Sequence, residues 1–448
     1  MEPHHIGTKP ELKDARLRVC YMAAMDARGV ALRALLSTLD GAALESAFGE
    51  AEGKAALDAR DRGFARLLVL TTLRRLGQID AVIGHCVTRP DDLPLPERGV
   101  LRLGAAQLLF LGTPAHAAVS ASVDAARSAT HKGLVNAVLR RISREGAALV
   151  AAQDAARLNT PDWLWKQLLA FGPAVARAIA DAHLQEPPLD LSVARDAADW
   201  AARLEAEILP IGSLRLRRAG IVSDLPGYAD GGWWVQDAAA ALPARLLLNR
   251  LDSTGQARVA DLCAAPGGKT AQLAAAGTMV TAVDRDSKRL ERVRENLRRL
   301  RLDATLVAAD AATWSPPAQF DAVLLDAPCT ATGTLRRNPD IAWHKGAGSA
   351  AALNKAQDLL LDAAARMLKP GGVMVYCVCS LDRREGAARI EALMHRQPDL
   401  RRVPIAADEV GGLGELVNPD GDLRTLPCHL GVVGGMDGFY AARLVRGG

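Results

Sequence analysis

After about residue 236, short apolar runs alternate with helical patterns, and this alternation constrains the fold more than any other feature of the 448-residue chain. Helical patterns at 270–276, 286–302 and 350–368 separate most of the apolar runs. A chain that repeats strand, helix and strand is expected to form a mostly parallel, doubly wound α/β sheet. The expected strands are 258–262, 279–284, 304–310, 320–326 and 372–380.

Two other segments precede this α/β part. Residues 1–150 place apolar side chains at helical spacing around a proline-rich loop at 89–96, which predicts an all-helical domain. Residues 151–235 predict a small α+β module, with strands near 189–193 and 208–216. The chain is therefore expected to be multidomain, with domains at 1–150, 151–235 and 236–448.

Composition excludes several classes of protein. With 49% hydrophobic and 24% charged residues, the chain is expected to be globular rather than disordered. The longest stretch without Asp, Glu, Lys or Arg, 103–123, contains Gln107, Gly112 and Pro114, so no membrane span is predicted. Residues 1–18 lack the apolar centre of a signal peptide, and seven cysteines without a CxxC pair predict neither a disulfide framework nor a structural zinc site. We therefore expect a cytoplasmic protein without metal, and nothing demands more than a monomer.

A glycine-rich loop follows the first expected strand of the α/β part. Its sequence, Leu262-Cys-Ala-Ala-Pro-Gly-Gly-Lys-Thr270, places Gly267 and Gly268 directly before a helix. Glycines let the backbone approach a ligand closely, and the N-terminus of the helix offers free N–H groups. The end of the loop resembles a phosphate-binding P-loop, but that motif requires a glycine where Cys263 stands, so this alternative fails.

Carboxylates follow the next two strands. Asp284 is placed to accept hydrogen bonds from both hydroxyls of a ribose, and Asp310 is placed to meet an adenine amino group. Either residue alone could be a helix cap or a turn residue. Together with the glycine loop they fit an adenosine without a pyrophosphate, which favours S-adenosylmethionine over NAD.

The fourth and fifth strands end in Asp326-Ala-Pro-Cys329 and Tyr376-Cys-Val-Cys379-Ser380. A thiolate can add to C6 of a pyrimidine and make C5 nucleophilic. A neighbouring carboxyl group can hydrogen-bond the ring N3, and a second thiol can help to remove the C5 proton. A lone cysteine at a strand end is more often a small buried hydrophobe, but two beside a cofactor loop favour chemistry. This reasoning does not decide whether Cys329 or Cys379 attacks.

These motifs resemble the RNA cytosine-5 methyltransferases of the Nop2/Sun type. The matching segments are 261–270, 326–329 and 376–380. In the helical region, 101–104, 118–119 and 134–140 are similar to a NusB domain. The combination resembles the bacterial Fmu/Sun subfamily, which methylates small-subunit (16S) ribosomal RNA, and further matches extend it over nearly the whole chain.

The resemblance implies a NusB-like RNA-binding domain, a middle module that positions RNA, and a Rossmann-like class I methyltransferase domain. Cys379 would attack C6, Cys329 would assist release, and Asp326 would lie next to the base. The residues that would bind S-adenosylmethionine are Cys263, Ala264, Ala265, Pro266, Gly267, Gly268, Lys269, Asp284, Asp310 and Asp326. The partner would be ribosomal RNA.

Three positions near the expected nucleophile need separate interpretation. Cys377 is interpreted as a packing residue. Val378 stands where the family usually has Thr, and a regular strand would direct it to the face opposite Cys379. Gly386 follows Glu385 where the family commonly has Asn.

Cations flank the expected site. The segment 285–301 holds eight cations and three anions, which predicts either RNA phosphate contact or a solvated helix face. Arg336 and Arg337 follow the Pro-Cys motif directly and are predicted to contact RNA. Trp343 and His344 could stack on bases, although packing is an equally good interpretation of the Trp.

The predicted reaction is the transfer of a methyl group from S-adenosylmethionine to C5 of a cytosine in 16S ribosomal RNA. One alternative is a binding protein whose helical domain recruits RNA or a transcription partner and whose catalytic half is vestigial. Titration with the cofactor would discriminate the two. Another alternative, methylation of a protein or a small molecule, gives no use to two cysteines at the rim.

Overall fold

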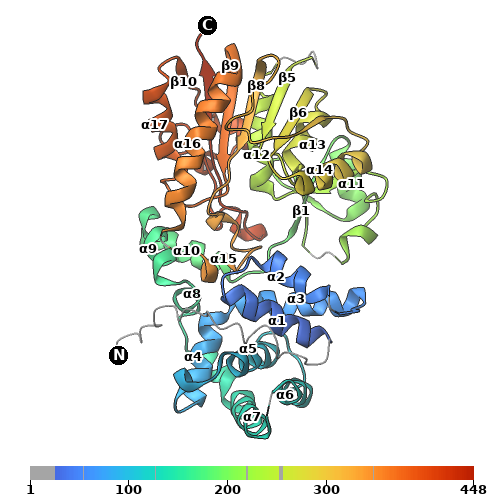
Figure 1. Ribbon diagram of the computed structural model, residues 1–448, viewed down its shortest axis with the longest axis vertical. Helices are drawn as coiled ribbons and strands as arrows, with labels where there is room; N and C mark the ends of the chain where they lie inside the picture. The colour runs from blue at the N-terminus through green and yellow to red at the C-terminus, as the bar shows by residue number, and fades with distance from the viewer. Residues whose placement is uncertain (1–25, 54, 127, 218–219, 252–255, 347) are drawn as a thin grey trace. The chain divides into compact units, whose positions relative to one another are not determined.

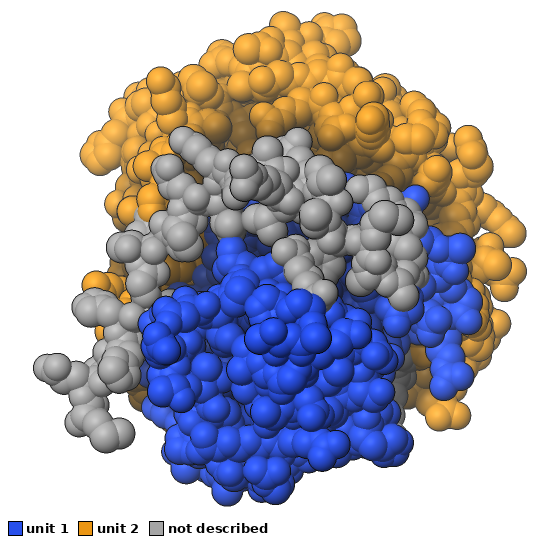
Figure 2. Space-filling view, turned by 60° about the horizontal axis from the view of Figure 1, so that its bottom comes forward, with its two compact units in different colours: residues 1–161, 338–344 blue, residues 162–337, 345–448 orange. Residues whose placement is uncertain are grey.

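The computed structural model describes residues 26–448 except 54, 127, 218–219, 252–255 and 347. The segment 1–18, on which the expectation about a signal peptide rests, lies outside the described residues. The chain divides into two compact units, coloured separately in Figure 2. Among the described residues, unit 1 comprises 26–161 and 338–344, and unit 2 comprises 162–337 and 345–448.

Unit 1 is helical. Its core is built from aliphatic side chains at helical spacing, and Leu68, Leu101 and Leu139 are completely buried. Asp26, Asp58 and Ser128 cap the helices that they precede, each accepting a hydrogen bond from a backbone N–H of the first turn. The elements are α1 (Ala27–Leu39), α2 (Leu44–Glu52), α3 (Ala59–Arg74), α4 (Leu76–Cys86), η2 (Pro90–Asp92), α5 (Leu95–Leu109), α6 (Ala115–Asp124), α7 (Ala129–Ala151), α8 (Ala155–Leu158) and α15 (Ile341–His344).

Unit 2 contains a small antiparallel sheet with the strand order β2-β3-β1-β4. Its first strand occupies the predicted range 189–193. The predicted run 208–216 is interrupted by a turn at Gly212, whose φ is +78°, and therefore gives two short strands. The elements here are α9 (Asp162–Leu168), η3 (Leu169–Phe171), α10 (Pro173–His183), β1 (Leu189–Val193), α11 (Ala197–Leu204), β2 (Glu207–Ile208), β3 (Leu214–Leu216), η4 (Val222–Asp224) and β4 (Trp233–Val235).

The second sheet of unit 2 has the strand order β10-β12-β9-β8-β5-β6-β7, with β11 paired to β12. The pairings from β5 to β9 are all parallel, whereas β12 runs antiparallel to both β9 and β10. The sheet is therefore mostly parallel, as the alternating pattern predicts. Its strands are β5 (Arg258–Leu262), β6 (Met279–Asp284), β7 (Thr305–Ala308), β8 (Phe320–Asp326), β9 (Leu368–Val378), β10 (Leu400–Arg402), β11 (Leu423–Arg424) and β12 (Tyr440–Arg446).

Helices cover both faces of this sheet (Figure 1). Along β8, Val323 and Leu325 pack with residues of α16 and α17, and Ala322 and Leu324 pack with residues of α12 on the other face. The helices are α12 (Ala238–Leu248), α13 (Gly268–Ala275), α14 (Ser287–Leu300), α16 (Ser349–Met367) and α17 (Ala387–Arg396). Short 3₁₀ turns are η5 (Thr332–Thr334), η6 (Ala407–Val410), η7 (Gly414–Leu416) and η8 (Gly431–Val433).

The order in which the chain connects the strands determines which edge of the large sheet can bind a ligand. From β5 the chain builds outward through β6 and β7, and then returns to the other side of β5 as β8 and β9. Such a reversal leaves a crevice beyond the carboxyl ends of the strands, where open α/β sheets bind ligands. None of the described helices is long and apolar enough to cross a membrane.

Candidate active site

The glycine loop joins β5 to α13 at this edge. Gly267 has a φ of +100°, a conformation that favours glycine, and a Cβ added there would lie 3.0 Å from a methyl carbon of Val293. Asp284, at the end of β6, holds the loop because its Oδ2 accepts a hydrogen bond from the backbone N–H of Ala265 at 3.1 Å. The loop thus leaves the sheet close to the carboxyl ends of β5 and β6.

The residues at this edge fit an adenosine-containing cofactor. Asp284 is 3% exposed, and each of its carboxylate oxygens accepts one backbone hydrogen bond, from Ala265 or Asp286. A carboxylate offers about four acceptor positions, so capacity for two hydroxyls remains. Asp310 lies two residues beyond β7, is exposed, and accepts a hydrogen bond from the N–H of Ala312. Asp310 therefore also acts as a turn residue, which was the alternative interpretation of a carboxylate at a strand end.

Lys269 connects the glycine loop to the end of β8. Its Nζ lies 2.7 Å from Oδ2 of Asp326. Although burial opposes the charge, Asp326 raises the pKa of Lys269 above its usual value. The other oxygen of Asp326, Oδ1, accepts a hydrogen bond from Sγ of Cys377 at 3.4 Å. The side chain of Asp326 remains 31% exposed, so this fixed carboxyl group can still meet a ligand.

Two cysteines lie together beyond the ends of β8 and β9. Sγ of Cys329 is 3.4 Å from Sγ of Cys379, and both residues are partly exposed. The hydrogen bond to Cys379, together with burial, raises the pKa of the Cys329 thiol well above its usual value. The two sulfurs lie within hydrogen-bond distance of each other, and either can donate.

The neighbours of Cys379 pack as expected. Cys377 is completely buried, and burial raises the pKa of its thiol well above the usual value, which fits a packing residue. Val378 packs in the cluster with α16 and α17, whereas Cys377 and Cys379 belong to the cluster on the other face of the sheet. The predicted orientation of Val378 is therefore confirmed.

Glu385 joins the two cysteine loops, and the sequence interpretation assigned it no role. Its buried carboxylate accepts hydrogen bonds from the N–H of Thr330, at 3.0 Å, and from the hydroxyl of Ser380, at 2.6 Å. Thr330 follows Cys329 directly, and Ser380 follows Cys379 directly. Gln357 of α16 also donates to Glu385, at 3.2 Å. The only signal for this role in the sequence was the place of Glu385 in the motif after Cys379.

The departure at Gly386 has a packing reason. A Cβ added there would lie 2.9 Å from the ring of Tyr440 and 3.0 Å from a guanidinium nitrogen of Arg424. Nη1 of that Arg424 donates to the carbonyl of Ser380 at 2.8 Å. In this chain, Arg424 and Tyr440 thus fill the space into which an asparagine at 386 would extend, and Arg424 supports the loop after Cys379.

The prediction that Arg336 contacts RNA does not agree with its burial. Its guanidinium is 1% exposed and pairs with Asp237 at 3.5 Å and with Asp437 at 3.4 Å. Arg337 is 25% exposed, and its Nη2 lies 2.6 Å from Oδ2 of Asp237. A buried guanidinium has no surface left for a phosphate, and the two terminal nitrogens of Arg336 already donate to the carbonyl of Gly434 and to these carboxylates. The pair is part of an internal charge network.

The other cations and aromatic residues divide between packing and exposure. In 285–301, Arg289 donates to the carbonyl of Ala265 at 2.6 Å and so supports the glycine loop, while Lys288 and Arg298 are exposed. Trp343 is a packed residue of unit 1, where its indole N–H donates to the carbonyl of Leu73 at 2.8 Å. The stacking role considered for Trp343 is therefore replaced by packing.

An open, mostly parallel sheet with a glycine loop after β5 and a cysteine pair beyond β8 and β9 defines a Rossmann-like methyltransferase, here joined to a helical unit. Comparison with known proteins gives the family. The family model described as 16S rRNA methyltransferase RsmB/F matches residues 248–445, and the NusB family model matches 25–144. The chain belongs to the RsmB/F family and is a methyltransferase that acts on small-subunit ribosomal RNA.

Individual relatives extend over most of the chain. The Ribosomal RNA small subunit methyltransferase B of Pseudomonas putida is 39% identical over 94% of this chain and 99% of its own length. That of Xanthomonas campestris is 41% identical over 78% of this chain and 83% of its own length. The resemblance expected from the motifs is thus confirmed, including the NusB-like domain.

Solved structures share the fold. The crystal structure of PH0851 aligns with a TM-score of 0.69 at 22% identity and covers 93% of this chain and 98% of its own. NSun6 from Pyrococcus horikoshii, solved with SFG, aligns with a TM-score of 0.55 at 18% identity and covers 64% of this chain and 98% of its own. At these identities the likeness supports the fold alone.

Proposed function

We propose that this enzyme methylates C5 of a cytosine in 16S ribosomal RNA through a covalent bond between Cys379 and C6 of the base. The observation that carries the proposal is the distance of 3.4 Å between the sulfurs of Cys329 and Cys379. A methyltransferase acting on an exocyclic nitrogen or a ribose hydroxyl would have no use for two thiols, because neither reaction needs a nucleophile added to the ring.

The reaction begins with the addition of the Cys379 thiolate to C6, which makes C5 nucleophilic. Asp326, held by Lys269 and Cys377, would contact the N3 edge of the ring and orient it. S-adenosylmethionine, when bound at the glycine loop and Asp284, supplies an electrophilic methyl group. The target base must leave its stack before C6 can meet the sulfur.

Cys329 would accept the C5 proton. The hydrogen bond between Cys329 and Cys379, together with burial, raises the pKa of the Cys329 thiol before the reaction. The sulfur of Cys379 carries no charge once it is bonded to C6, which removes one of the causes that raise the pKa of Cys329. Cys329, which is partly exposed, can then release its thiol proton to water and, as a thiolate, accept the proton from C5. The C6–S bond breaks as the C5–C6 double bond re-forms, and Cys379 leaves as a thiolate.

Substitution of each cysteine tests the proposal. Cys379→Ala should abolish methylation of transcribed 16S ribosomal RNA, because no nucleophile remains. Cys329→Ala should accumulate a covalent protein–RNA adduct that resists denaturing electrophoresis, because the C5 proton is not removed. Cys428→Ala, at a partly exposed cysteine outside the site, is the control and should methylate normally. Normal methylation by Cys379→Ala would overturn the assignment.

Bisulfite sequencing of ribosomal RNA from cells with and without this chain would identify the modified base. One cytosine should lose its resistance to conversion when the chain is absent.

We also propose that the enzyme works as a cytoplasmic monomer, with residues 1–150 binding RNA and 151–235 positioning it. The RNA-binding role is supported by the relatives named for ribosomal RNA and by the match to the NusB family model. The vestigial alternative predicts that calorimetry detects no binding of S-adenosylmethionine.

A further inference from the structure

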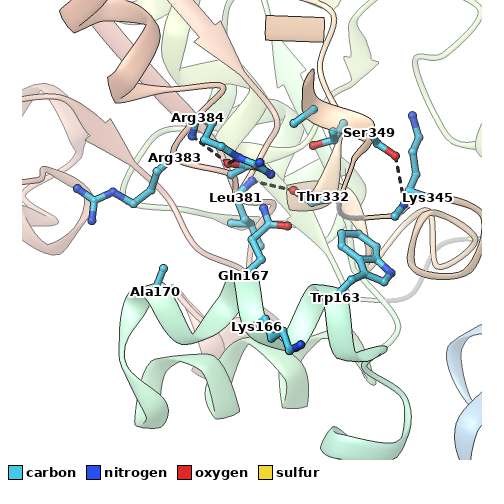
Figure 3. A pocket seen from close by; sticks show the side chains of 14 residues that line it. Trp163, Lys166, Gln167, Ala170, Thr332, Lys345, Ser349, Leu381, Arg383 and Arg384 are labelled. Atoms are coloured by element: carbon cyan, nitrogen blue, oxygen red, sulfur yellow. Dashed lines mark hydrogen bonds and ion pairs between the residues drawn. The ribbon is translucent and has the colours of Figure 1, made fainter. Parts of the chain in front are cut away.

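A cationic pocket in unit 2 lies against the two loops that carry the cysteines. Its volume is about 300 Å³. Thr330, directly after Cys329, and Leu381, two residues after Cys379, form part of its wall. The N–H of Leu381 donates to the hydroxyl of Thr332 at 2.9 Å, so the two loops are bonded to one another at the wall (Figure 3). The two cysteine loops therefore form one wall of the pocket.

The remaining walls come from α9 and from the chain that enters α16. Trp163 and Gln167 project from α9 toward the cysteine loops (Figure 3). Lys345 and Ser349 line the side next to α16, where the hydroxyl of Ser349 accepts a hydrogen bond from the N–H of Gly346 at 3.1 Å. The cofactor loop does not contribute to the lining, so the pocket is separate from the expected place of S-adenosylmethionine.

The charge of the lining favours an anion. Four cations, Lys166, Lys345, Arg383 and Arg384, line the pocket together with one carboxylate, Asp382. Arg384 already pairs with that carboxylate at 2.6 Å. Among the described residues, neither Lys166 nor Lys345 forms an ion pair with a carboxylate. The pocket thus combines an indole with two lysines whose charges are not neutralised by the protein.

We propose that this pocket binds one nucleotide of the RNA strand next to the target cytosine. The base would stack on Trp163, and its phosphate would meet Lys166 and Lys345. Aromatic rings and cationic side chains are the usual partners of unstacked RNA bases and of their backbone. The proposal rests on the proposed function, since an enzyme that extracts a base from its stack must hold the strand beside it.

Binding of transcribed 16S ribosomal RNA to the full chain tests the proposal. Trp163→Ala should raise the Kd by roughly five- to 150-fold, the effect of one lost stacking contact. Trp163→Phe should restore most of the affinity, because a phenyl ring still stacks. The double variant Lys166→Ala/Lys345→Ala should lower the slope of log Kd against log salt by about 0.7, the contribution of the one single-strand phosphate that both lysines would contact. Lys355→Ala, an exposed lysine of α16 outside the pocket, should change neither quantity.

The outcomes separate this proposal from the proposed function. Wild-type RNA affinity and salt slope in all the pocket variants, combined with normal formation of 5-methylcytosine, would overturn the pocket and leave the reaction intact. That result would also be expected if the pocket received a protein segment instead of RNA. Loss of RNA affinity in the pocket variants would support the pocket even if the wild-type enzyme modified no cytosine, an outcome that would overturn the reaction alone.

Discussion

Asp261 shows how strongly the free energy of unfolding can depend on the protonation of a single buried carboxyl group. It lies in β5, is fully buried, and accepts a hydrogen bond from the hydroxyl of Thr270 at 2.5 Å. Burial raises the pKa of Asp261 to about 7. A raised pKa means that the folded chain binds the proton more tightly than the unfolded chain. The resulting stabilisation is complete below about pH 4 and is lost as the pH rises toward 7.

Asp261→Asn should remove this dependence. The free energy of unfolding of the variant, relative to wild type, should rise by roughly 2–3 kcal/mol between pH 5 and pH 8.5, because only the wild type must bury a charge at high pH. Urea titrations of both proteins across this range measure the difference. Asp303→Asn, an exposed carboxylate before β7, is the control. Parallel pH profiles for Asp261→Asn and wild type would contradict the prediction.

At the scale of elements, the active site depends on the ends of two parallel strands. Asp326 of β8 is paired in register with Cys377 of β9, so the loops that follow begin side by side. The N–H of Gly333 donates to the carbonyl of Cys379 at 3.0 Å, which joins the loops directly. Glu385 then connects the residues that follow the two cysteines. The distance between the sulfurs is a consequence of this bracing.

Glu385→Ala should lower kcat for methylation at least tenfold with little change in KM for RNA. The reason is that displacement of a reacting group by about 1 Å can reduce the rate 100-fold. Glu385→Gln should recover part of the rate, because its carbonyl can still accept from Thr330 and the hydroxyls can reverse their hydrogen bonds. Single-turnover methylation measures these effects. Glu391→Ala, at an exposed position of α17, should behave as wild type, and an unchanged kcat in Glu385→Ala would show that the brace does not position the sulfurs.

The sequence predicts the parallel half of the large sheet well. Strands β5, β6 and β8 occupy the expected ranges 258–262, 279–284 and 320–326, because each is a buried apolar run with clear boundaries. The strands β10, β11 and β12 were not predicted. The first two have three and two residues, and β12 contains Arg443, which is buried against Glu409. Periodicity cannot identify a buried strand whose charges are paired by residues distant in the chain.

The candidate site was predicted in the same uneven way. Asp326, Cys329 and Cys379 lie at strand ends, and topology alone brings strand ends together. Arg336 was misassigned because its partners, Asp237 and Asp437, are about one hundred residues away on either side. A sequence reveals an arginine next to a motif, but its burial depends on which acids the fold delivers to it.

At the scale of the molecule, that arginine belongs to a buried network that connects the small sheet of unit 2 to the segments that precede α12 and β12. Asp190 of β1 pairs with Arg215 of β3 at 2.7 Å, and it also accepts a hydrogen bond from the N–H of Ala238 in α12 at 3.0 Å. Arg337 lies 3.9 Å from Asp190 and 2.6 Å from Asp237. Burial and the neighbouring Asp237 raise the pKa of Asp437 to about 7. The network contains three arginines and three carboxylates, so removal of one guanidinium leaves buried charge uncompensated.

Arg336→Met should therefore reduce the free energy of unfolding by about 3–5 kcal/mol, the cost of breaking a buried ion pair from one side. Urea unfolding at neutral pH measures the loss, and Arg298→Met on the exposed face of α14 should change it by about 0.5 kcal/mol or less. RNA binding by the same proteins distinguishes a structural role from a phosphate contact. Folded Arg336→Met should keep the wild-type slope of log Kd against log salt, since Arg336 meets carboxylates and not phosphates. A variant of normal stability with a reduced salt slope would return Arg336 to the RNA-binding surface and contradict the network.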